Sequence, residues 1–261
     1  MKTKFFISAI FFSSIANFAF AQAHDEFKSK CSLSIAYNSV EAQIGKPEET
    51  VWKYAYASTY DREGDKKDNS YSFSIIPKYS ISDDVTLRFE FSITKINVTN
   101  YYFISHNQYG YFKDTIQQKI FRYMPGIQWS FFKKKRIETY CGLSAIYLNY
   151  GKTYWSEYSI DLNPGGNWYF LNTSVPGGFA AGAGAFAGFN FYLHKNISFG
   201  AELSSSLLYY KIGGKFTASG IHFITSSGTT NVLDPYWIAH DSFEGTQFSK
   251  MLSSFNISIY F

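Results

Sequence analysis

Residues 85–93 read Val-Thr-Leu-Arg-Phe-Glu-Phe-Ser-Ile, with an apolar side chain at every odd position and a polar one at every even position. Side chains of a β-strand alternate between two faces, so this pattern indicates a strand with one apolar and one polar face. The same alternation recurs at 179–193, 197–209 and 251–261. In these stretches no odd position is charged, and only Ser205 and Ser253 are polar. The odd face is therefore predicted to lie against an apolar medium.

The composition of the even face distinguishes two kinds of β-protein. A soluble sandwich would turn its apolar face to a core and present a face rich in Lys and Glu to water. Here the even face carries Ser, Gly, Thr, Asn and Tyr with isolated charges. This mixture is typical of the interior of a narrow transmembrane β-barrel, in which lipid-facing and interior residues alternate. We therefore favour a membrane barrel over a soluble sandwich.

The overall composition excludes several other classes of protein. Aromatic residues make up 21% of the 261 residues and charged residues 17%, which excludes a disordered chain. After residue 21 no apolar run approaches the roughly 18 residues of a membrane-spanning helix. The net charge of +4 is spread along the chain, so no nucleic-acid-binding surface is predicted.

The N-terminus has the features of a secretory signal peptide. Lys2 and Lys4 precede an apolar segment at 5–15, and Ala19-Phe20-Ala21 forms a small-residue cleavage site. An uncleaved membrane anchor is disfavoured because the apolar segment is too short to span a bilayer. The domain organisation is therefore predicted as a signal peptide at 1–21 and a barrel domain at 22–261.

Turn lengths predict the number of strands and their orientation. The expected strands are 31–38, 70–81, 85–97, 115–132, 136–148, 178–193, 197–210 and 246–261. They are joined alternately by short turns, at 82–84, 133–136 and 194–196, and by long connections, at 39–69, 98–114, 149–177 and 211–245. In outer-membrane barrels the short turns are periplasmic and the long loops extracellular. The predicted fold is therefore all-β, an eight-stranded antiparallel transmembrane β-barrel with four long extracellular loops.

Two features complicate this assignment. Trp52, Tyr54, Tyr56 and Tyr60 also alternate, but a ninth spanning strand there would place every later short turn on the wrong side of the membrane. This segment is therefore predicted to be a β-like part of the first loop. Pro77 and Pro125 lie in the middle of predicted strands, where each removes a ladder hydrogen bond, and are expected to mark bulges.

Two stretches resemble a known family. Residues 182–193, Gly-Ala-Gly-Ala-Phe-Ala-Gly-Phe-Asn-Phe-Tyr-Leu, with the turn 194–196 and the strand 197–202, resemble hairpins of the OmpA-like and OmpX/Opa-like eight-stranded outer-membrane barrels. The last seven residues look like the C-terminal signal that the barrel-assembly machinery recognises. The resemblance implies an assembly signal at Phe255, Ile257, Ile259 and Phe261. The chain departs from full-length OmpA in one respect, because no periplasmic peptidoglycan-binding domain is expected after Phe261.

Charged residues on the even face are the first candidate site. Glu90 and Glu202 each lie six residues after a turn residue, Asp84 and Asn196, in two hairpins that align without gaps. Because an unpaired charge in a narrow lumen is unfavourable, these carboxylates should pair with cations. The predicted lumen network comprises Lys78, Arg88, Glu90, Arg122, Glu138, Glu202 and Lys250. It could gate a small pore, but an eight-stranded barrel is just wide enough for its side chains, so a structural plug is favoured.

Aromatic residues in the long connections are the second candidate site. Tyr and Trp among Ser, Asn and Gly are typical of binding surfaces, because rigid rings offer large contact areas. The candidates are Trp52, Tyr54, Tyr56, Tyr101, Tyr102, Trp155, Trp168, Tyr236 and Trp237. The alternative is that they form the upper aromatic girdle of the barrel and pack the loops together.

Signals for catalysis and metal binding are poor in the sequence. Some outer-membrane barrels are enzymes that modify lipid A, but none of their motifs stands out here. His240, Asp241 and Ser242 are adjacent in the sequence, but a catalytic triad is defined by how its side chains converge in space. Their adjacency is therefore not evidence for a triad. The five histidines lack ligand spacing, so neither a catalytic residue, a metal site nor a cofactor is predicted. Cys31 and Cys141 are expected on opposite sides of the barrel and therefore without a disulfide.

These observations lead to one functional expectation and one alternative. The chain is expected to be a non-enzymatic protein of the bacterial outer membrane, with a structural or adhesin-like surface role through its extracellular loops. The alternative is a small, low-conductance channel for ions or small solutes. The expected partners are outer-membrane lipid, lipopolysaccharide and, during insertion, the barrel-assembly machinery. The barrel itself is expected to be a monomer, and an extracellular ligand is not identified.

Overall fold

The computed structural model describes residues 30–38, 64–104, 110–134, 136–161, 168–224, 229–249 and 251–261. These residues form β1 (Cys31–Asn38), β2 (Gly64–Asp68), β3 (Tyr71–Ser80), β4 (Val85–Ile104), β5 (Gly110–Lys134), β6 (Ile137–Tyr150), β7 (Thr153–Asp161), β8 (Trp168–Val175), β9 (Gly178–His194), β10 (Ile197–Ile224), β11 (Thr229–Phe248) and β12 (Leu252–Tyr260). Within these ranges no helix is long and apolar enough to cross a membrane. The predicted signal peptide at 1–21 lies outside the described residues.

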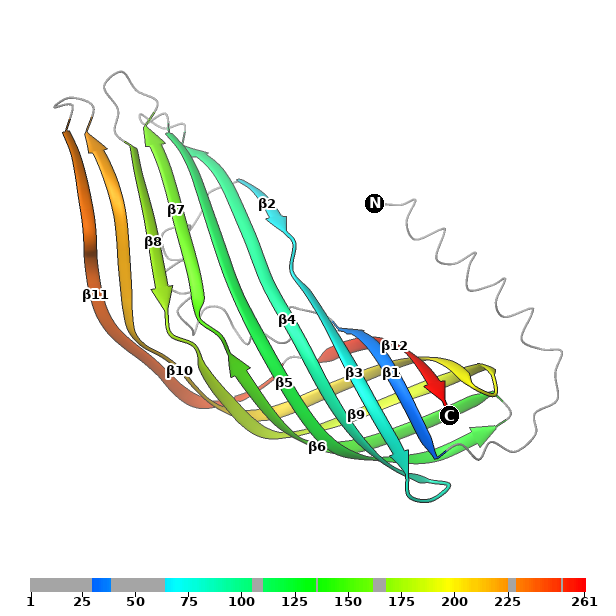
Figure 1. Ribbon diagram of the computed structural model, residues 1–261. Helices are drawn as coiled ribbons and strands as arrows, with labels where there is room; N and C mark the ends of the chain where they lie inside the picture. Colours follow the sequence, from blue (N-terminus) through cyan, green and yellow to red (C-terminus); the bar gives the residue numbers. More distant parts are fainter. Residues whose placement is uncertain are drawn as a thin grey trace.

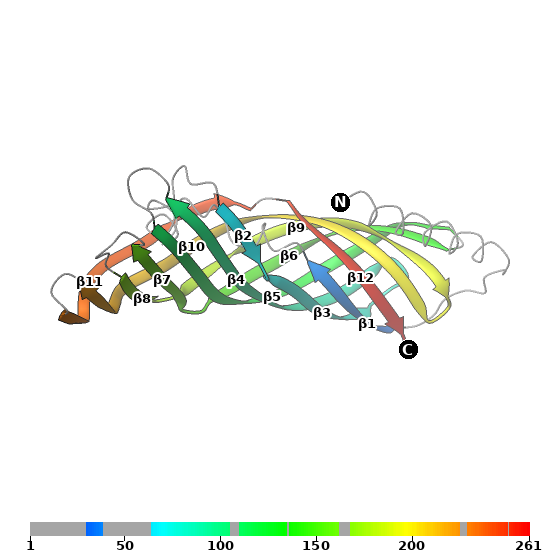
Figure 2. The ribbon, with the colours of Figure 1, turned by 90° about the horizontal axis from the view of Figure 1, so that it is seen from above.

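The strands close into a ring. Antiparallel pairs join β1 to β3, β3 to β4, β4 to β5, β5 to β6, β6 to β9, β9 to β10, β10 to β12 and β12 back to β1. Figure 1 and Figure 2 show β1 and β12 side by side where the ring closes. Because β2 leads into β3, β6 into β7, β8 into β9 and β11 into β12, the twelve segments amount to eight barrel strands. The eight-stranded antiparallel barrel predicted from the sequence is confirmed.

The short turns lie at one end of the ring, as predicted. They join β3 to β4, β5 to β6 and β9 to β10. At the first of them, the backbone amide of Ile81 donates to the carbonyl of Val85 over 2.8 Å, and Val85 donates back to the Ser82 hydroxyl over 3.1 Å. The opposite end carries the long connections.

The predicted bulges at the two prolines are wrong. The register of β3 on β4 continues unshifted from Ile75 opposite Phe91 to Lys78 opposite Arg88. Pro125 stays in register opposite Phe89. A proline removes one amide donor but leaves the extended backbone intact, so each strand loses a rung without gaining a residue.

Much of what was predicted as loop is strand. The connections 98–114, 149–177 and 211–245 contain the upper parts of β4, β5 and β10, together with β7, β8 and most of β11. These segments form a sheet in the order β2-β4-β5-β7-β8-β10-β11, which rises from the barrel and curves away from it (Figure 1). The barrel wall therefore continues well beyond the membrane on one side.

Two one-residue shifts explain why the alternation could not be followed through residues 149–177. Tyr150 at the end of β6 and Thr153 at the start of β7 are both buried, so the inward parity changes from even to odd. It changes back between Val175 and Ala180. A Cβ atom on Gly177 would lie 1.8 Å from the Tyr150 carbonyl oxygen, so only glycine allows the strands to approach this closely here.

The outward face forms a band that suits a bilayer. In β5 the odd positions from Phe121 to Phe131 are apolar, with Lys119 and Lys133 beyond either end. At about 3.4 Å per residue and a strand tilt of about 40°, this segment covers about 25 Å along the barrel axis. Leu87, Phe89 and Phe199 face outward in the same band, each more than 40% exposed. Large apolar side chains exposed in this way are accounted for by contact with lipid.

An aromatic belt marks the extracellular end of this band. It consists of Phe91, Phe121, Tyr123, Tyr147, Phe179 and Tyr209, whose ring centroids are 5.3–6.4 Å apart from one contact to the next. The belt crosses β4, β5, β6, β9 and β10. Aromatic girdles occupy this level in transmembrane barrels because their rings suit the membrane–water interface.

Candidate functional site

Six of the seven charged residues predicted for the lumen lie among the described residues, at even positions on five strands. Lys78 lies on β3, Arg88 and Glu90 on β4, Arg122 on β5, Glu138 on β6 and Glu202 on β10. All are buried, because successive side chains of a strand point to opposite faces and the even face points inward. Together they carry three formal positive and three formal negative charges. The lumen is therefore electrically balanced among these residues.

Arg88 is the centre of this network. Its Nη1 atom lies 2.6 Å from Oε2 of Glu202, and its Nη2 atom lies 3.2 Å from Oε1 of the same carboxylate. Nη2 also donates to Oε2 of Glu90 over 3.1 Å. The two glutamates that occupy matching places in the aligned hairpins thus converge on one guanidinium. A bidentate arginine–carboxylate pair is among the stronger and more directional polar contacts in proteins.

Further donors complete the coordination of both carboxylates. Arg122 approaches Oε1 of Glu90 to 3.8 Å, and the Ser74 hydroxyl donates to the same oxygen over 2.8 Å. The Tyr140 hydroxyl donates to Oε2 of Glu202 over 3.1 Å. Ions removed from water are tolerated when paired and hydrogen-bonded in this way.

Aromatic rings fill the space around the ion pairs. The Arg88 guanidinium lies 4.1 Å from the centroid of the Phe186 ring, and the Lys78 ammonium lies 5.7 Å from that of Tyr140. Both rings are buried, and their centroids are 6.4 Å apart. Gly142 faces Phe186, and a Cβ atom there would lie 2.2 Å from the Phe186 Cζ atom. Glycine on the lumen face therefore makes room for the ring.

We expect Gly142→Ala to lower the free energy of unfolding by about 1–3 kcal/mol, because the added methyl overpacks the lumen. The added Cβ would also lie 2.3 Å from the backbone oxygen of Ile127, so the strand must shift. Urea unfolding of the protein in lipid vesicles measures the effect. Phe186→Leu in the same chain should recover part of the loss. Gly245→Ala, where the nearest atom is the end of the Tyr210 side chain at 3.0 Å, is the control and should have little effect.

Glu138 lies outside the Arg88 cluster, nearer the short-turn end of the lumen. It accepts hydrogen bonds from the Ser130 hydroxyl, from the Asn190 amide over 3.0 Å and from the Tyr192 hydroxyl over 2.6 Å. These donors are neutral, so this carboxylate is held by hydrogen bonds rather than by a direct ion pair. Lys250, the remaining predicted member of the network, lies outside the described residues.

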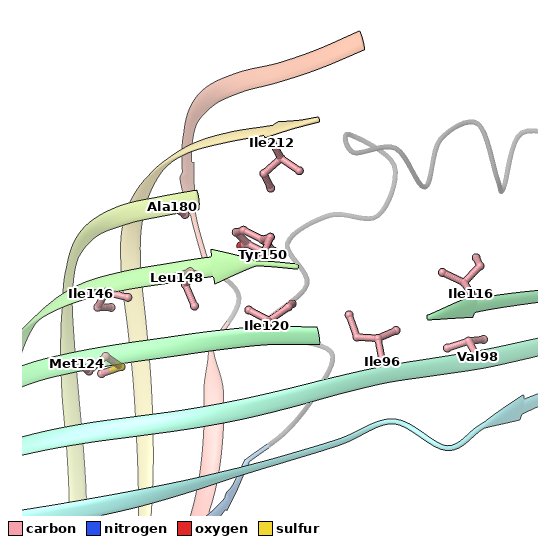
Figure 3. Packing of buried hydrophobic residues seen from close by; sticks show 10 residues of the cluster. All are labelled: Ile96, Val98, Ile116, Ile120, Met124, Ile146, Leu148, Tyr150, Ala180 and Ile212. Atoms are coloured by element: carbon pink, nitrogen blue, oxygen red, sulfur yellow. The ribbon is translucent and has the colours of Figure 1, made fainter. Parts of the chain in front are cut away.

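The upper part of the lumen is largely apolar, with buried Asp114 and Gln118 as polar exceptions, which differs from the polar interior expected along its whole height. Ten buried residues gather there from β4, β5, β6, β9 and β10 (Figure 3): Ile96, Val98, Ile116, Ile120, Met124, Ile146, Leu148, Tyr150, Ala180 and Ile212. We call them the upper apolar cluster. Seven of them occupy even positions within the predicted spanning strands, so the prediction of a polar even face is wrong at this height: Ile96, Ile116, Ile120, Met124, Ile146, Leu148 and Ala180. The other three, Val98, Tyr150 and Ile212, lie in what was predicted as the long connections.

Three observations establish which kind of β-protein this is. Eight strands close into a ring, the outward face carries an apolar band, and the inward face carries a charged network. The chain is an eight-stranded β-barrel of the outer-membrane type. No protein-family model matches the chain, and no curated protein does so either.

Three solved structures illustrate what the chain is similar to. The outer membrane protein OprG from Pseudomonas aeruginosa shares 10% sequence identity at a TM-score of 0.33, over 90% of this chain and 98% of OprG. Neisserial surface protein A shares 12% at a TM-score of 0.30, over 88% and 96%. CarO of Acinetobacter baumannii shares 10% at a TM-score of 0.32, over 77% and 98%.

The predicted loop aromatics separate into distinct groups. Tyr101 lies half-buried on the outward side of β4, whereas Trp155 on β7 faces inward and packs against the upper apolar cluster. Trp168 is half-buried at the start of β8. Trp52, Tyr54 and Tyr56 lie outside the described residues, as do the side chains of Tyr102, Tyr236 and Trp237. Trp155 is therefore a packing residue and not part of an exposed surface.

The residues of the predicted assembly signal lie on the strand that closes the ring. Phe255, Ile257 and Ile259 are exposed on the outward face of β12, and Phe261 follows the strand. Cys31 and Cys141 also face outward, on β1 and β6, and form no disulfide, as predicted.

The neutral members of the lumen network were missed at the sequence level. Tyr140 and Phe186 both occupy even positions, each two residues from a glycine that is also at an even position. A large ring beside glycine on an interior face is a signal that could have identified them. Ser74 and Asn190 carry no comparable signal, because short polar residues occur throughout the even face.

Proposed function

We propose that this chain is a non-catalytic integral protein of the outer membrane with a closed lumen, and that its extracellular sheet is the surface through which it acts. The Arg88 network carries the proposal. It bridges the barrel from β4 to β10, with Arg88, Glu90 and Glu202 each less than 10% exposed. Tyr140, Phe186 and the upper apolar cluster fill space in the same interior. A lumen occupied in this way favours a structural barrel over an open pore.

A tyrosine patch on the extracellular sheet supports the surface role. It consists of Tyr101 on β4, Tyr111 on β5 and Tyr158 on β7. The first two rings have centroids 6.3 Å apart, and Lys113 stands opposite both Tyr101 and Tyr158 in the strand register. Burial, together with the neighbouring Tyr101 and Tyr158, raises the pKa of the Tyr111 hydroxyl. Clustered tyrosines beside a cation offer rigid rings and hydrogen bonds to a partner.

Conductance in planar bilayers tests the closed lumen. We expect the purified wild-type barrel to leave the bilayer current at its baseline, because ion pairs and rings occupy the path of ions. Steady current steps from the wild-type protein would contradict this part of the proposal. A folded barrel with its tyrosine patch removed should give the same baseline, which separates the lumen from the outer surface.

Adhesion tests the surface role. Cells displaying the wild-type barrel are compared with cells displaying a variant with Tyr101, Tyr111 and Tyr158 changed to Ser, on surfaces coated with collagen, fibronectin or laminin. We expect several-fold weaker adhesion of the variant to at least one coating. Phe at the same positions keeps the rings and is the matched control. Equal adhesion by the wild type and the Ser variant would remove the support for an adhesin-like role.

The alternative is a small channel gated by the ion pairs. One observation favours it: Arg88 joins strands from different sides of the lumen, so rearranging one side chain would remove a bridge across the barrel. If Glu202→Gln conducts while the wild type does not, a gated pathway exists and the channel function replaces the closed barrel. If neither conducts, the network acts as a plug.

A further inference from the structure

Three lysines stand side by side on the outward wall. Lys95 on β4 lies directly opposite Lys119 on β5 in the antiparallel register. On the other side of β5, the Gly151 amide donates to the Lys119 carbonyl over 2.8 Å, which places Lys152 next to Lys119. The side chains of Lys119 and Lys152 are exposed, and that of Lys95 is half-buried. We call these three residues the lysine row.

The lysine row is not neutralised within the described part of the chain. None of its members forms an ion pair there. Lys211 on β10, at a similar height, lies 3.2 Å from Glu244, and hydrogen bonds from Tyr209 and Lys211 lower the pKa of that carboxyl. Like charges directly opposite each other destabilise a sheet. An external anion at this level would relieve the repulsion between Lys95 and Lys119.

The position of the lysine row along the barrel axis indicates where in the membrane that anion would lie. Lys119 is separated by a single residue from Phe121 of the aromatic belt, at the extracellular end of the apolar band. Directly above the row, β4 and β5 present amides and hydroxyls: the Gln117 amide lies 3.4 Å from the Asn97 side-chain oxygen, and the hydroxyls of Thr99 and Thr115 lie 3.3 Å apart. Charged residues return beside and above them, with Lys67 of β2 opposite Thr99 and Lys113 of β5 opposite Tyr101. From the aromatic belt up to Thr99 and Thr115, the outward face of β4 and β5 therefore changes from apolar to cationic to amide and hydroxyl.

We propose that the lysine row binds the phosphate groups of lipopolysaccharide in the outer leaflet. The three levels of the wall match the three parts of that molecule: acyl chains against the aromatic belt, phosphates at the lysines, and sugars beside the amides and hydroxyls. Lysine is a compact, flexible cation that suits phosphate as a point charge. The inference rests on the placement of the barrel in the outer membrane and is independent of whether the lumen is closed.

Binding of diphosphoryl lipid A to the full barrel in phosphatidylcholine nanodiscs tests this site. The variant carries Lys95→Gln, Lys119→Gln and Lys152→Gln, and should bind roughly 100-fold more weakly than the wild type, on the usual contribution of a basic residue near an anionic membrane surface. The matched control carries Lys133→Gln, Lys134→Gln and Lys195→Gln at the periplasmic end, with the same change in net charge. The control should bind as the wild type does.

Further measurements distinguish the source of the phosphate and the state of the fold. Lipid A stripped of phosphate should bind the wild type as weakly as diphosphoryl lipid A binds the variant. Equal binding of diphosphoryl lipid A by wild type and variant, or full competition by inorganic phosphate at matched ionic strength, would overturn the lipid site. Gel mobility of unheated samples checks that the variant folds. If it does not fold, Lys119→Gln alone should weaken binding roughly 5-fold. Unchanged binding by that variant would also overturn the site.

Discussion

Arg88→Leu is expected to lower the free energy of unfolding of the barrel by about 3–5 kcal/mol, the usual effect of removing one partner of a buried ion pair. The guanidinium makes three short contacts, two with Glu202 and one with Glu90. Leucine fills part of the same volume but leaves Glu202 buried without a cation in contact. Urea titration of the refolded protein in lipid vesicles, followed by tryptophan fluorescence, measures the change.

A second substitution tests whether the uncompensated charge is the cause. Arg88→Leu combined with Glu202→Gln should recover much of the loss, because Glu90 keeps Arg122 at 3.8 Å and the lumen regains charge balance. Lys134→Leu, which removes a positive charge from the exposed end of β5, is the control and should stay within about 0.5 kcal/mol of the wild type. If Arg88→Leu proves no more costly than this control, the carboxylates are solvated by water in the lumen.

Leu87→Arg is expected to lower the free energy of unfolding by about 2–4 kcal/mol, the usual effect of a cation on the lipid face near the bilayer midplane. Leu87 is 43% exposed on the outward face, opposite Ile127 of β5 in the middle of the apolar band. Arginine there would place its charge in hydrocarbon. The same vesicle titration measures the effect, with bilayers of defined thickness to fix the position of the midplane.

Two matched substitutions distinguish the effect of depth in the bilayer from the effect of facing lipid rather than the lumen. Phe131 lies at the periplasmic edge of the same band, and its side chain is 69% exposed. Phe131→Arg should lower the free energy of unfolding by only about 0–1 kcal/mol. Thr86 is half-buried on the lumen face beside the short turn, and its hydroxyl is hydrogen-bonded to that of Ser80 over 3.3 Å. Thr86→Arg should lower the free energy of unfolding less than Leu87→Arg does. Equal losses at Leu87 and Phe131 would show that the barrel sits in the bilayer at a different height.

Most of the fold could be predicted from the sequence, because the alternation of apolar and polar residues along a strand is a local property. A strand turns successive side chains to opposite faces whatever it pairs with, so Leu87 and Phe89 could be placed outward and Arg88 and Glu90 inward from their positions alone. Strand number followed from the alternation of short and long connections. One limit came at Tyr150, where a one-residue shift reverses the parity and hides β7 and β8. Another came in β4, β5 and β10, which continue beyond the predicted strands with no change of parity.

The candidate site could be predicted from the sequence only in part. The alignment of two hairpins placed Glu90 and Glu202 at equivalent positions, and the cost of an isolated buried charge required cations for both. The sequence offered Lys78, Arg88, Arg122 and Lys250 as partners without distinguishing among them. Arg88 became the shared partner because the stagger of the ring brings β4 and β10 within reach of one guanidinium across the lumen.

By itself, the sequence determined which face of each strand meets lipid, how many strands cross, and which acidic residues share a level. These properties depend on a period of two and on turn length, both of which are readable along the chain. The tertiary structure alone decided that both carboxylates meet at Arg88, that Gly142 makes room for Phe186, and that an apolar cluster occupies the upper lumen. Those outcomes depend on register and closure, which bring together residues as far apart in the sequence as Arg88 and Glu202 and leave no periodic trace in it.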